Sequence, residues 1–223
     1  MTRTGAAARP PLDLDERAET FFEWIQLHSR HVAIGLGIVV AAGITGYLYI
    51  RSQASRERRA YESLVTASAA VDAKNWALAQ NDLERLVQRY EGTAAGQQAA
   101  LLLSEVLYAT GKYQQGIDQL TRLAAGADAD VRAVAEAQIA AGYEDLKNFP
   151  EAARHYTAAA ERARFEPEKA LYMADAARAY TAAGNPEAAK RIWSELAEDD
   201  AGPVAGEARI RLGELEAQVA KRM

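Results

Sequence analysis

The stretch GNPEAAKRIW (184–193) nearly repeats the stretch NFPEAARHYT (148–157), with an asparagine, a proline, a glutamate and two alanines in the same order. Related stretches lie upstream, at GKYQQGIDQL (111–120) and KNWALAQNDL (74–83). Equivalent positions in the four stretches are 37, 36 and 37 residues apart, and they are Trp76, Tyr113, Phe149 and Pro186. The chain therefore contains four units with one period, which is typical of stacked repeat folds.

Each unit has the pattern of a helix, a turn and a second helix. Before the turn, apolar residues recur at helical spacing in an alanine-rich segment, as in residues 96–110 and 169–183. The first helix then reaches residues that can adopt the left-handed conformation, at Gly111, Lys147–Asn148 and Gly184–Asn185. We therefore expect a tight turn between two antiparallel helices in each unit.

The second helix of two units carries start signals. Asn148 with Glu151 three residues later resembles a capping box. Pro186 follows Asn185, where proline suits the first helical position. Both signals predict that the second helix begins directly after the turn.

Small and large residues alternate at fixed places in the second helices. The small residues are Ala79, Gly116, Ala152 and Ala189. Large residues follow four positions later, at Leu83, Leu120, Tyr156 and Trp193, and a further position three residues on holds Leu86, Leu123, Ala159 and Leu196. Small residues facing large ones indicate that one helix presses into the groove of its partner and that each pair packs on the next pair. The repetition therefore serves stacking.

This pattern resembles the tetratricopeptide repeat over roughly residues 60–198. Tyr143 and Tyr180 match the first-helix tyrosine of that family, and Ala140 and Ala177 match its small close-packing position. The period is nearer 37 than the family's 34, and Ala70 stands where the first unit would have the tyrosine. The last segment, residues 202–222, has no following partner and is expected to cap the repeats. Its charged outer face would consist of Glu207, Arg209, Arg211, Glu214 and Glu216.

A separate segment, VAIGLGIVVAAGITGYLYI (32–50), contains no charged residue over 19 positions. As a helix it would be about 28 Å long, close to the thickness of the hydrocarbon core of a bilayer. Residues typical of membrane interfaces mark its two ends, namely His28, Arg30 and His31 at one end and Tyr47, Tyr49 and Arg51 at the other. We predict a transmembrane helix here. A buried core helix and a cleaved signal peptide, with Ser52 and Ala54 near a cleavage site, are the alternatives; the run is longer than a usual signal-peptide core.

Small residues recur every four positions in this segment, at Ala33, Gly37, Ala41 and Thr45. Such a stripe lets another helix approach closely, so it is a candidate docking face for a second membrane helix. The alternative is that small residues are simply common in transmembrane helices. The predicted organisation is an N-terminal tail and juxtamembrane amphipathic helix (1–31), a transmembrane helix (32–50) and a repeat domain (51–223).

Composition excludes several classes of chemistry. The chain has no cysteine and three histidines, and its net charge of −5 argues against a nucleic acid as the main partner. No phosphate-binding loop, zinc-protease motif or nucleophile elbow is present. We therefore expect no catalytic residue, no metal, no cofactor, no small-molecule substrate and no enzymatic activity. We interpret His155 as lying on an exposed helix face and Glu144–Asp145 as polar lining of a groove.

The predicted fold is all-α, a transmembrane helix followed by a tetratricopeptide-like α-solenoid of about four helix pairs plus a capping helix. The resemblance implies that first-helix residues line a concave groove that binds an extended or helical protein segment. The matching positions are Gln98, Leu101, Glu105, Tyr108, Glu144, Asp145 and Arg178. The alternative is that these residues are only solvated.

The order of leader, single span, the short segment RSQASRERRAYESL (51–64) and four repeat units resembles the bacterial family of ancillary subunits of the Sec translocon. This resemblance implies an inner-membrane protein with a cytoplasmic N-terminus and periplasmic repeats. The implied partners are translocon subunits, periplasmic chaperones and exported polypeptides.

Two alternatives remain open. A membrane-anchored scaffold for envelope assembly or cell division would share these features. A regulatory scaffold facing the cytoplasm is favoured by charge, because Arg17 and Arg30 precede the span whereas four arginines follow it closely. Those four are Arg51, Arg56, Arg58 and Arg59.

Overall fold

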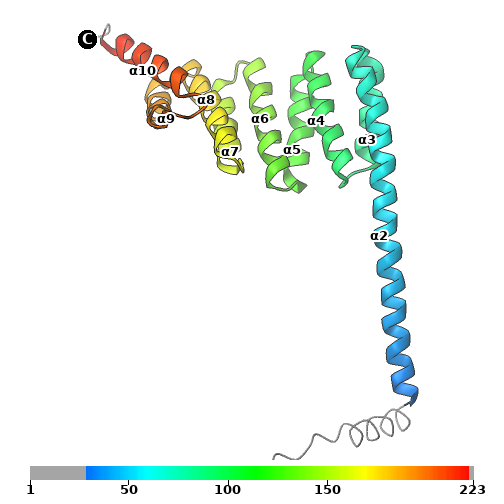
Figure 1. The fold of residues 1–223 in the computed structure, drawn as a ribbon. Coiled ribbons are helices and arrows are strands. Elements are labelled where there is room, and N and C mark those ends of the chain that lie inside the picture. The colour runs from blue at the N-terminus through cyan, green and yellow to red at the C-terminus, as the bar shows by residue number, and fades with distance from the viewer. Residues whose placement is uncertain (1–28, 221–223) are drawn as a thin grey trace, which may run out of the picture. The chain divides into compact units, whose positions relative to one another are not determined.

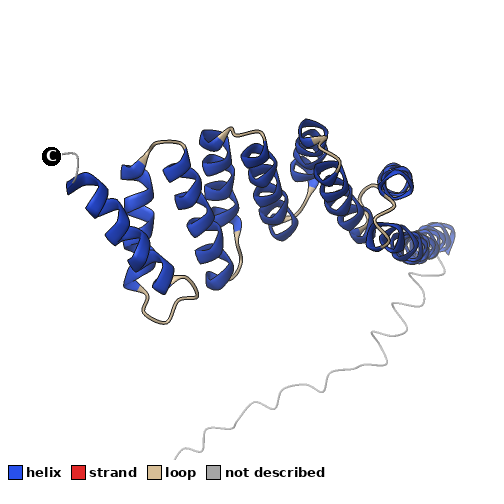
Figure 2. Cartoon of the chain, turned by 90° about the horizontal axis from the view of Figure 1, so that it is seen from above, coloured by secondary structure: helices blue, strands red, loops and turns tan. Residues whose placement is uncertain are grey.

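The computed structural model describes residues 29–220, and within this range the chain forms nine helices and no strand (Figure 2). The tail and most of the juxtamembrane helix predicted for residues 1–31 lie outside the described residues. The helices are α2 (Ser29–Asp72), α3 (Trp76–Arg89), α4 (Ala94–Ala109), α5 (Tyr113–Gly126), α6 (Ala129–Asp145), α7 (Phe149–Arg162), α8 (Glu166–Ala182), α9 (Pro186–Glu198) and α10 (Ala205–Ala220). The predicted all-α repeat fold is confirmed.

The chain divides into two compact units, residues 1–54 and 55–223. In the second unit, consecutive helices from α3 to α10 pack against each other in chain order (Figure 1). The last part of α2 joins α3 and α4 through a shared core that contains Ala60, Leu64 and Leu83. The unit is thus four helix pairs, of which α2 supplies the first helix, followed by α10.

The turns within the four pairs share one backbone geometry. Lys74, Gly111, Lys147 and Gly184 have positive φ angles of 54°, 75°, 59° and 76°. These residues stand 37, 36 and 37 positions apart, so the left-handed turn repeats with the sequence period. Glycine takes this conformation without strain, and the two lysines adopt it at some cost.

The start signals of the second helices are only partly confirmed. The Asn185 side chain accepts a hydrogen bond from Ala188 N at 3.2 Å, and Asn75 accepts one from Leu78 N at 3.3 Å. The capping box predicted at Asn148 and Glu151 is wrong, because Asn148 makes no side-chain cap bond. Pro150 occupies the second helical position, so one of the two N–H groups to which an N-cap side chain can bond is missing there.

The predicted small and large positions form the core of the repeats. Ala79, Ala152 and Ala189 are fully buried, and Gly116 is buried as well. The large residues Leu83, Leu120 and Trp193 expose at most 1% of their surface. Because each contact joins neighbouring helices, the core is a series of local clusters and not one central mass.

The first helix of the chain's second unit is tied to the turn between α3 and α4. The Glu57 carboxylate accepts hydrogen bonds from Ala94 N at 3.1 Å and Ala95 N at 2.9 Å, at the N-terminus of α4. The Arg56 guanidinium donates to the carbonyl oxygens of Arg89 and Glu91 at 3.2 and 3.3 Å. A carboxylate at a helix N-terminus and a guanidinium on free carbonyls both satisfy groups that helix ends leave unpaired.

In the first unit, the described part of α2 exposes its large apolar side chains. Ile38, Val39 and Ile50 are 64%, 67% and 69% exposed. A search of the described residues finds no helix that is both long and apolar enough to cross a membrane, so the predicted transmembrane helix is not supported by this structure. The side chains of Val32 and Leu36 lie outside the described residues.

Candidate functional site

The first helices α4, α6 and α8 carry the predicted binding residues of the repeat domain, and α10 follows them as the first helix after the fourth pair. We call the surface formed by these four helices the first-helix face. Gln98, Glu105 and Asp145 are exposed on it, whereas Leu101, Tyr108, Glu144 and Arg178 are half-buried. The predicted residues therefore divide into solvated groups and groups that also hold the repeats together.

Gln138 connects α4 to α6. Its side-chain oxygen accepts from Ser104 Oγ at 3.0 Å, and its amide nitrogen donates to Glu105 Oε1 at 3.1 Å. Burial raises the pKa of Glu105, and this hydrogen bond offsets part of the rise. Sequence reasoning missed Gln138, although it stands 37 residues before Asp175, which also contacts a groove residue.

Tyr108 fills the space between α4, α5 and α6. Its hydroxyl donates to the Gln138 carbonyl oxygen at 3.0 Å. A Cβ atom at Gly142 would lie 2.5 Å from Tyr108 Oη, and a Cβ at Gly116 would also clash with the ring. Glycine at both positions therefore makes room for the aromatic ring between two repeats.

Glu144 and Asp145 are neighbours in sequence but have different environments. Glu144 Oε2 accepts from the Tyr156 hydroxyl on α7 at 3.1 Å, whereas Asp145 is exposed. Burial raises the pKa of Glu144, and the bond from Tyr156 partly opposes that shift. Burial also raises the pKa of Tyr156, with the nearby Glu144 carboxylate adding to the effect. Glu144 therefore contributes to packing between α6 and α7, and Asp145 to the solvated surface.

Arg178 joins α8 to α10. Its guanidinium contacts Asp175 Oδ1 at 2.5 Å and Glu207 Oε1 at 2.7 Å. Burial alone would lower the pKa of Arg178, but the hydrogen bonds to Glu207 and Asp175 outweigh this effect and raise it. Arg178 is therefore held in place by two carboxylates.

The predicted charged face of α10 is present, with one exception. Arg209, Arg211, Glu214 and Glu216 are exposed, whereas Glu207 is half-buried. Arg211 lies 3.0 Å from Glu214 and 3.6 Å from Glu207. Glu207 thus links Arg178 and Arg211 and does not belong to the outer surface.

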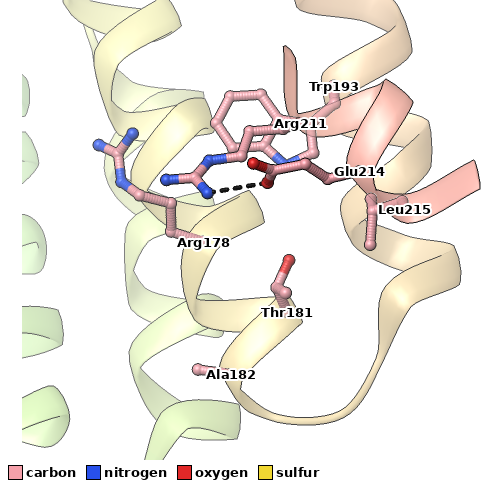
Figure 3. Close-up of a pocket in the computed structure, with 7 residues that line it drawn as sticks. All are labelled: Arg178, Thr181, Ala182, Trp193, Arg211, Glu214 and Leu215. Carbon is pink, nitrogen blue, oxygen red and sulfur yellow. Dashed lines mark hydrogen bonds and ion pairs between the residues drawn. The ribbon is translucent and has the colours of Figure 1, made fainter. Parts of the chain in front are cut away.

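A pocket of about 310 Å³ lies between α8, α9 and α10 (Figure 3). Its lining residues are Arg178, Thr181, Ala182, Trp193, Arg211, Glu214 and Leu215. Trp193, Ala182 and Leu215 give it apolar walls, and the charged side chains stand around them. The pocket is therefore an apolar hollow with polar groups at its edge, a combination that suits ligand binding.

The interpretation of His155 as an exposed surface residue is wrong. Its Nδ1 lies 2.7 Å from Glu136 Oε2 on α6, and its ring stacks on Tyr143 at 5.4 Å. The hydrogen bond with His155 is the main reason that the pKa of Glu136 is lowered. His155 on α7 therefore faces α6, the first helix of its own repeat. Among the described residues, no group of three or more acidic or histidine side chains could hold a metal ion.

The candidate docking residues Ala33, Gly37, Ala41 and Thr45 are all exposed on α2. Thr45 Oγ1 donates to the Ala41 carbonyl oxygen at 2.8 Å, which keeps its polar group on its own helix. Apart from the adjacent residues and the nearby backbone of α2 itself, no described atom lies within 4 Å of where a Cβ at Gly37 would be. The stripe is therefore open, and its docking role stays a prediction.

Comparison with known proteins supports the repeat assignment. A putative kinesin light chain with nearly identical TPR-like repeats from Podosopora anserina matches with a TM-score of 0.60 and 16% identity, covering 74% of this chain and 89% of the other. A tetratricopeptide repeat protein from Parabacteroides merdae matches with a TM-score of 0.57 and 16% identity, covering 72% and 61%. At such identities the likeness shows the fold alone. A search of curated proteins found no match.

The model of a family described as a tetratricopeptide repeat-like domain matches residues 23–195, which is most of the chain. The repeat fold indicates a protein-binding scaffold, and no catalytic family is indicated. Together with the four helix pairs and their common turn, this match shows that the chain belongs to the tetratricopeptide repeat-like domain family.

Proposed function

We propose that this protein is a membrane-tethered scaffold of the bacterial inner membrane and an ancillary subunit of the Sec translocon. Residues 32–50 would anchor it beside the channel, and the repeats would meet periplasmic chaperones or exported polypeptides. One observation carries the proposal. The family match over residues 23–195 includes both the charge-free run of 19 residues and most of the repeat domain.

The exposure of the apolar run supports a tether. Ile34, Val40 and Ile44 are 54%, 52% and 56% exposed on the described part of α2. Large apolar side chains at this density are unfavourable in water, since each contributes roughly 1.5–3 kcal/mol when it is transferred to an apolar environment. A lipid bilayer or another apolar helix would provide that environment.

Two of the arginines after the run form hydrogen bonds in the folded chain. Arg56 is bonded to two backbone carbonyl groups of the α3–α4 turn. Arg59 donates to Ser55 Oγ at 3.4 Å. These bonds do not remove Arg56 from the positive-inside count, and the periplasmic placement rests instead on the size of the repeat domain, because long domains are translocated largely regardless of charge. The cytoplasm-facing regulatory scaffold is the second candidate, and it depends on the same four arginines.

Topology is the first test of the proposal. We expect a reporter that is active only in the periplasm to be active when fused after Met223, and a reporter that fluoresces only in the cytoplasm to stay dark at the same site. Swapped behaviour of the two reporters would reject the periplasmic scaffold and favour the cytoplasmic one. Release of both fusions into the soluble fraction would reject the tether itself.

The small-residue stripe gives a separate prediction about the translocon. Gly37→Leu should reduce photo-crosslinking of α2 to translocon subunits in membranes about tenfold, because a leucine blocks close approach of a second helix. Gly46→Leu is the matched control, since residue 46 lies on the opposite side of the helix, nine residues or about 180° away. Equal crosslinking of both variants would remove the docking claim.

A further inference from the structure

One residue in the wall of the pocket between α8, α9 and α10 has counterparts at the other repeat interfaces. Thr181 on its wall stands 37 residues after Glu144, and Glu144 stands 36 residues after Tyr108. All three lie near the C-terminal end of a first helix, one residue after Leu107, Tyr143 and Tyr180 respectively. The same place in the repeat is therefore occupied by three different side chains.

At the first of these interfaces the chain fills the space with its own aromatic ring. Tyr108 projects between α4, α5 and α6, where Gly116 and Gly142 leave room for it. At the second interface, the Tyr156 hydroxyl of α7 donates a hydrogen bond to Glu144 at 3.1 Å. At these two interfaces the equivalent residue therefore supplies or contacts an aromatic ring. The ring at the Tyr156 position of the third interface is Trp193, which lines the pocket.

At the third interface, the side chain of Thr181 is too small to fill the space between the helices. Thr181 Oγ1 donates to the Ala177 carbonyl oxygen of its own helix at 2.8 Å, so the side chain stays on α8. The hollow of about 310 Å³ remains, with the ring of Trp193 in its wall. Its volume is at the lower end of the range for ligand pockets, so it suits one side chain better than a whole small molecule.

We propose that this pocket receives a single phenylalanine or tyrosine side chain of a polypeptide partner that lies on the first-helix face. The occupant is inferred from the fold itself, because Tyr108 provides an aromatic ring at the equivalent place. The inference rests on the proposed scaffold function, since it assumes a polypeptide ligand, and it names the residue type that this ligand must supply.

The charges at the pocket also specify what lies beside the aromatic residue. The two guanidiniums that line the pocket, those of Arg178 and Arg211, form ion pairs with three carboxylates, those of Asp175, Glu207 and Glu214, of which Glu214 alone also lines the pocket. Both arginines are already paired, so the excess charge is negative. A lysine next to the aromatic residue of the partner would complement it, although an exposed ion pair adds only about 0.2–1 kcal/mol.

The test uses the purified full chain in mild detergent and a probe peptide, acetyl-Gly-Lys-Phe-Lys-Gly-amide. We expect millimolar peptide to shift the NMR resonance of the Trp193 indole N–H, which is assigned with Trp193→Phe. The matched peptide with alanine in place of phenylalanine should bind at least about tenfold more weakly, because burial of an aromatic side chain contributes most of the affinity. Equal shifts with both peptides would overturn the proposal.

Filling the pocket from within provides the protein-side control. Thr181→Tyr should abolish the shift, because the new ring would occupy the hollow as Tyr108 does at its interface. Thr121→Tyr is the matched control, since Thr121 Oγ1 also bonds the carbonyl four residues earlier, at 2.8 Å, but lies on α5. Thr181→Leu replaces Thr181→Tyr if the tyrosine variant loses helicity. Unchanged peptide binding in the folded Thr181 variant would overturn the proposal.

Other occupants would be detected by crosslinking. A photoreactive phenylalanine analogue at position 182 should crosslink to the phenylalanine peptide. A crosslink to residues 1–28 of the same chain, or to a second copy of the chain, would overturn the polypeptide-partner proposal. Because these measurements use purified protein, they are independent of the topology and translocon tests. Failure of peptide binding together with a periplasmic reporter signal would reject the pocket and leave the tethered scaffold standing.

Discussion

Trp193→Ala is expected to destabilise the C-terminal end of the repeat domain by about 3–5 kcal/mol, the range found when large aromatic side chains are removed from cores. Trp193 is 1% exposed and belongs to a cluster that joins α8, α9 and α10 through Ala177, Val204 and Leu215. Because each repeat contacts only its neighbours, the loss should remain local. Urea denaturation followed by circular dichroism should show an early transition in the variant.

Hydrogen exchange distinguishes local from global unfolding in this variant. Amides of α8, α9 and α10 should lose protection, and those of α4 and α5 should keep it. Phe165→Ala is the matched control, because this aromatic side chain is 61% exposed and its removal should cost little. A uniform loss of protection along the repeats would contradict the expectation that each repeat is stabilised only by its neighbours.

The repeat architecture was predictable because the same physical requirement recurs four times. A helix pair cannot bury its apolar face alone, so small residues such as Ala152 and large ones such as Trp193 must recur wherever pairs meet. The left-handed turn was visible at Gly111 and Gly184 for the same reason. Lys74 adopts the same conformation with no glycine to mark it, and only its place in the period identifies it.

The details of the candidate site depend on neighbours that no local pattern reveals. The orientation of His155 is decided by Glu136, which lies 19 residues earlier on another helix. Arg178 is held by Glu207, which lies 29 residues later. The periodicity of one helix indicates which side is apolar, but it does not show which polar residues meet a partner across the interface. The pocket likewise follows from the absence of a large side chain at Thr181, which becomes meaningful once Tyr108 is seen to fill the equivalent place.

Tyr108→Ala is expected to cost about 3 kcal/mol and to open, between α4, α5 and α6, a hollow like the one beside Trp193. The side chain is half-buried, packs against Gly116 and Gly142, and donates a hydrogen bond to the Gln138 carbonyl oxygen at 3.0 Å. Tyr108→Phe keeps the ring and loses only that bond, so it should cost about 1 kcal/mol. Urea denaturation of both variants separates the contribution of the ring from that of the hydroxyl.

Chemical rescue then tests whether the hollow accepts an aromatic ring from outside. Millimolar 4-methylphenol, which has the structure of the tyrosine side chain, should restore part of the lost stability of Tyr108→Ala, because an apolar cavity in a protein binds a small aromatic molecule of matching shape. Tyr61→Ala is the control, since Tyr61 is 58% exposed and its removal leaves no enclosed space. If 4-methylphenol stabilises neither variant, the hollow collapses when the ring is removed. The repeat interface would then not keep an aromatic site by itself.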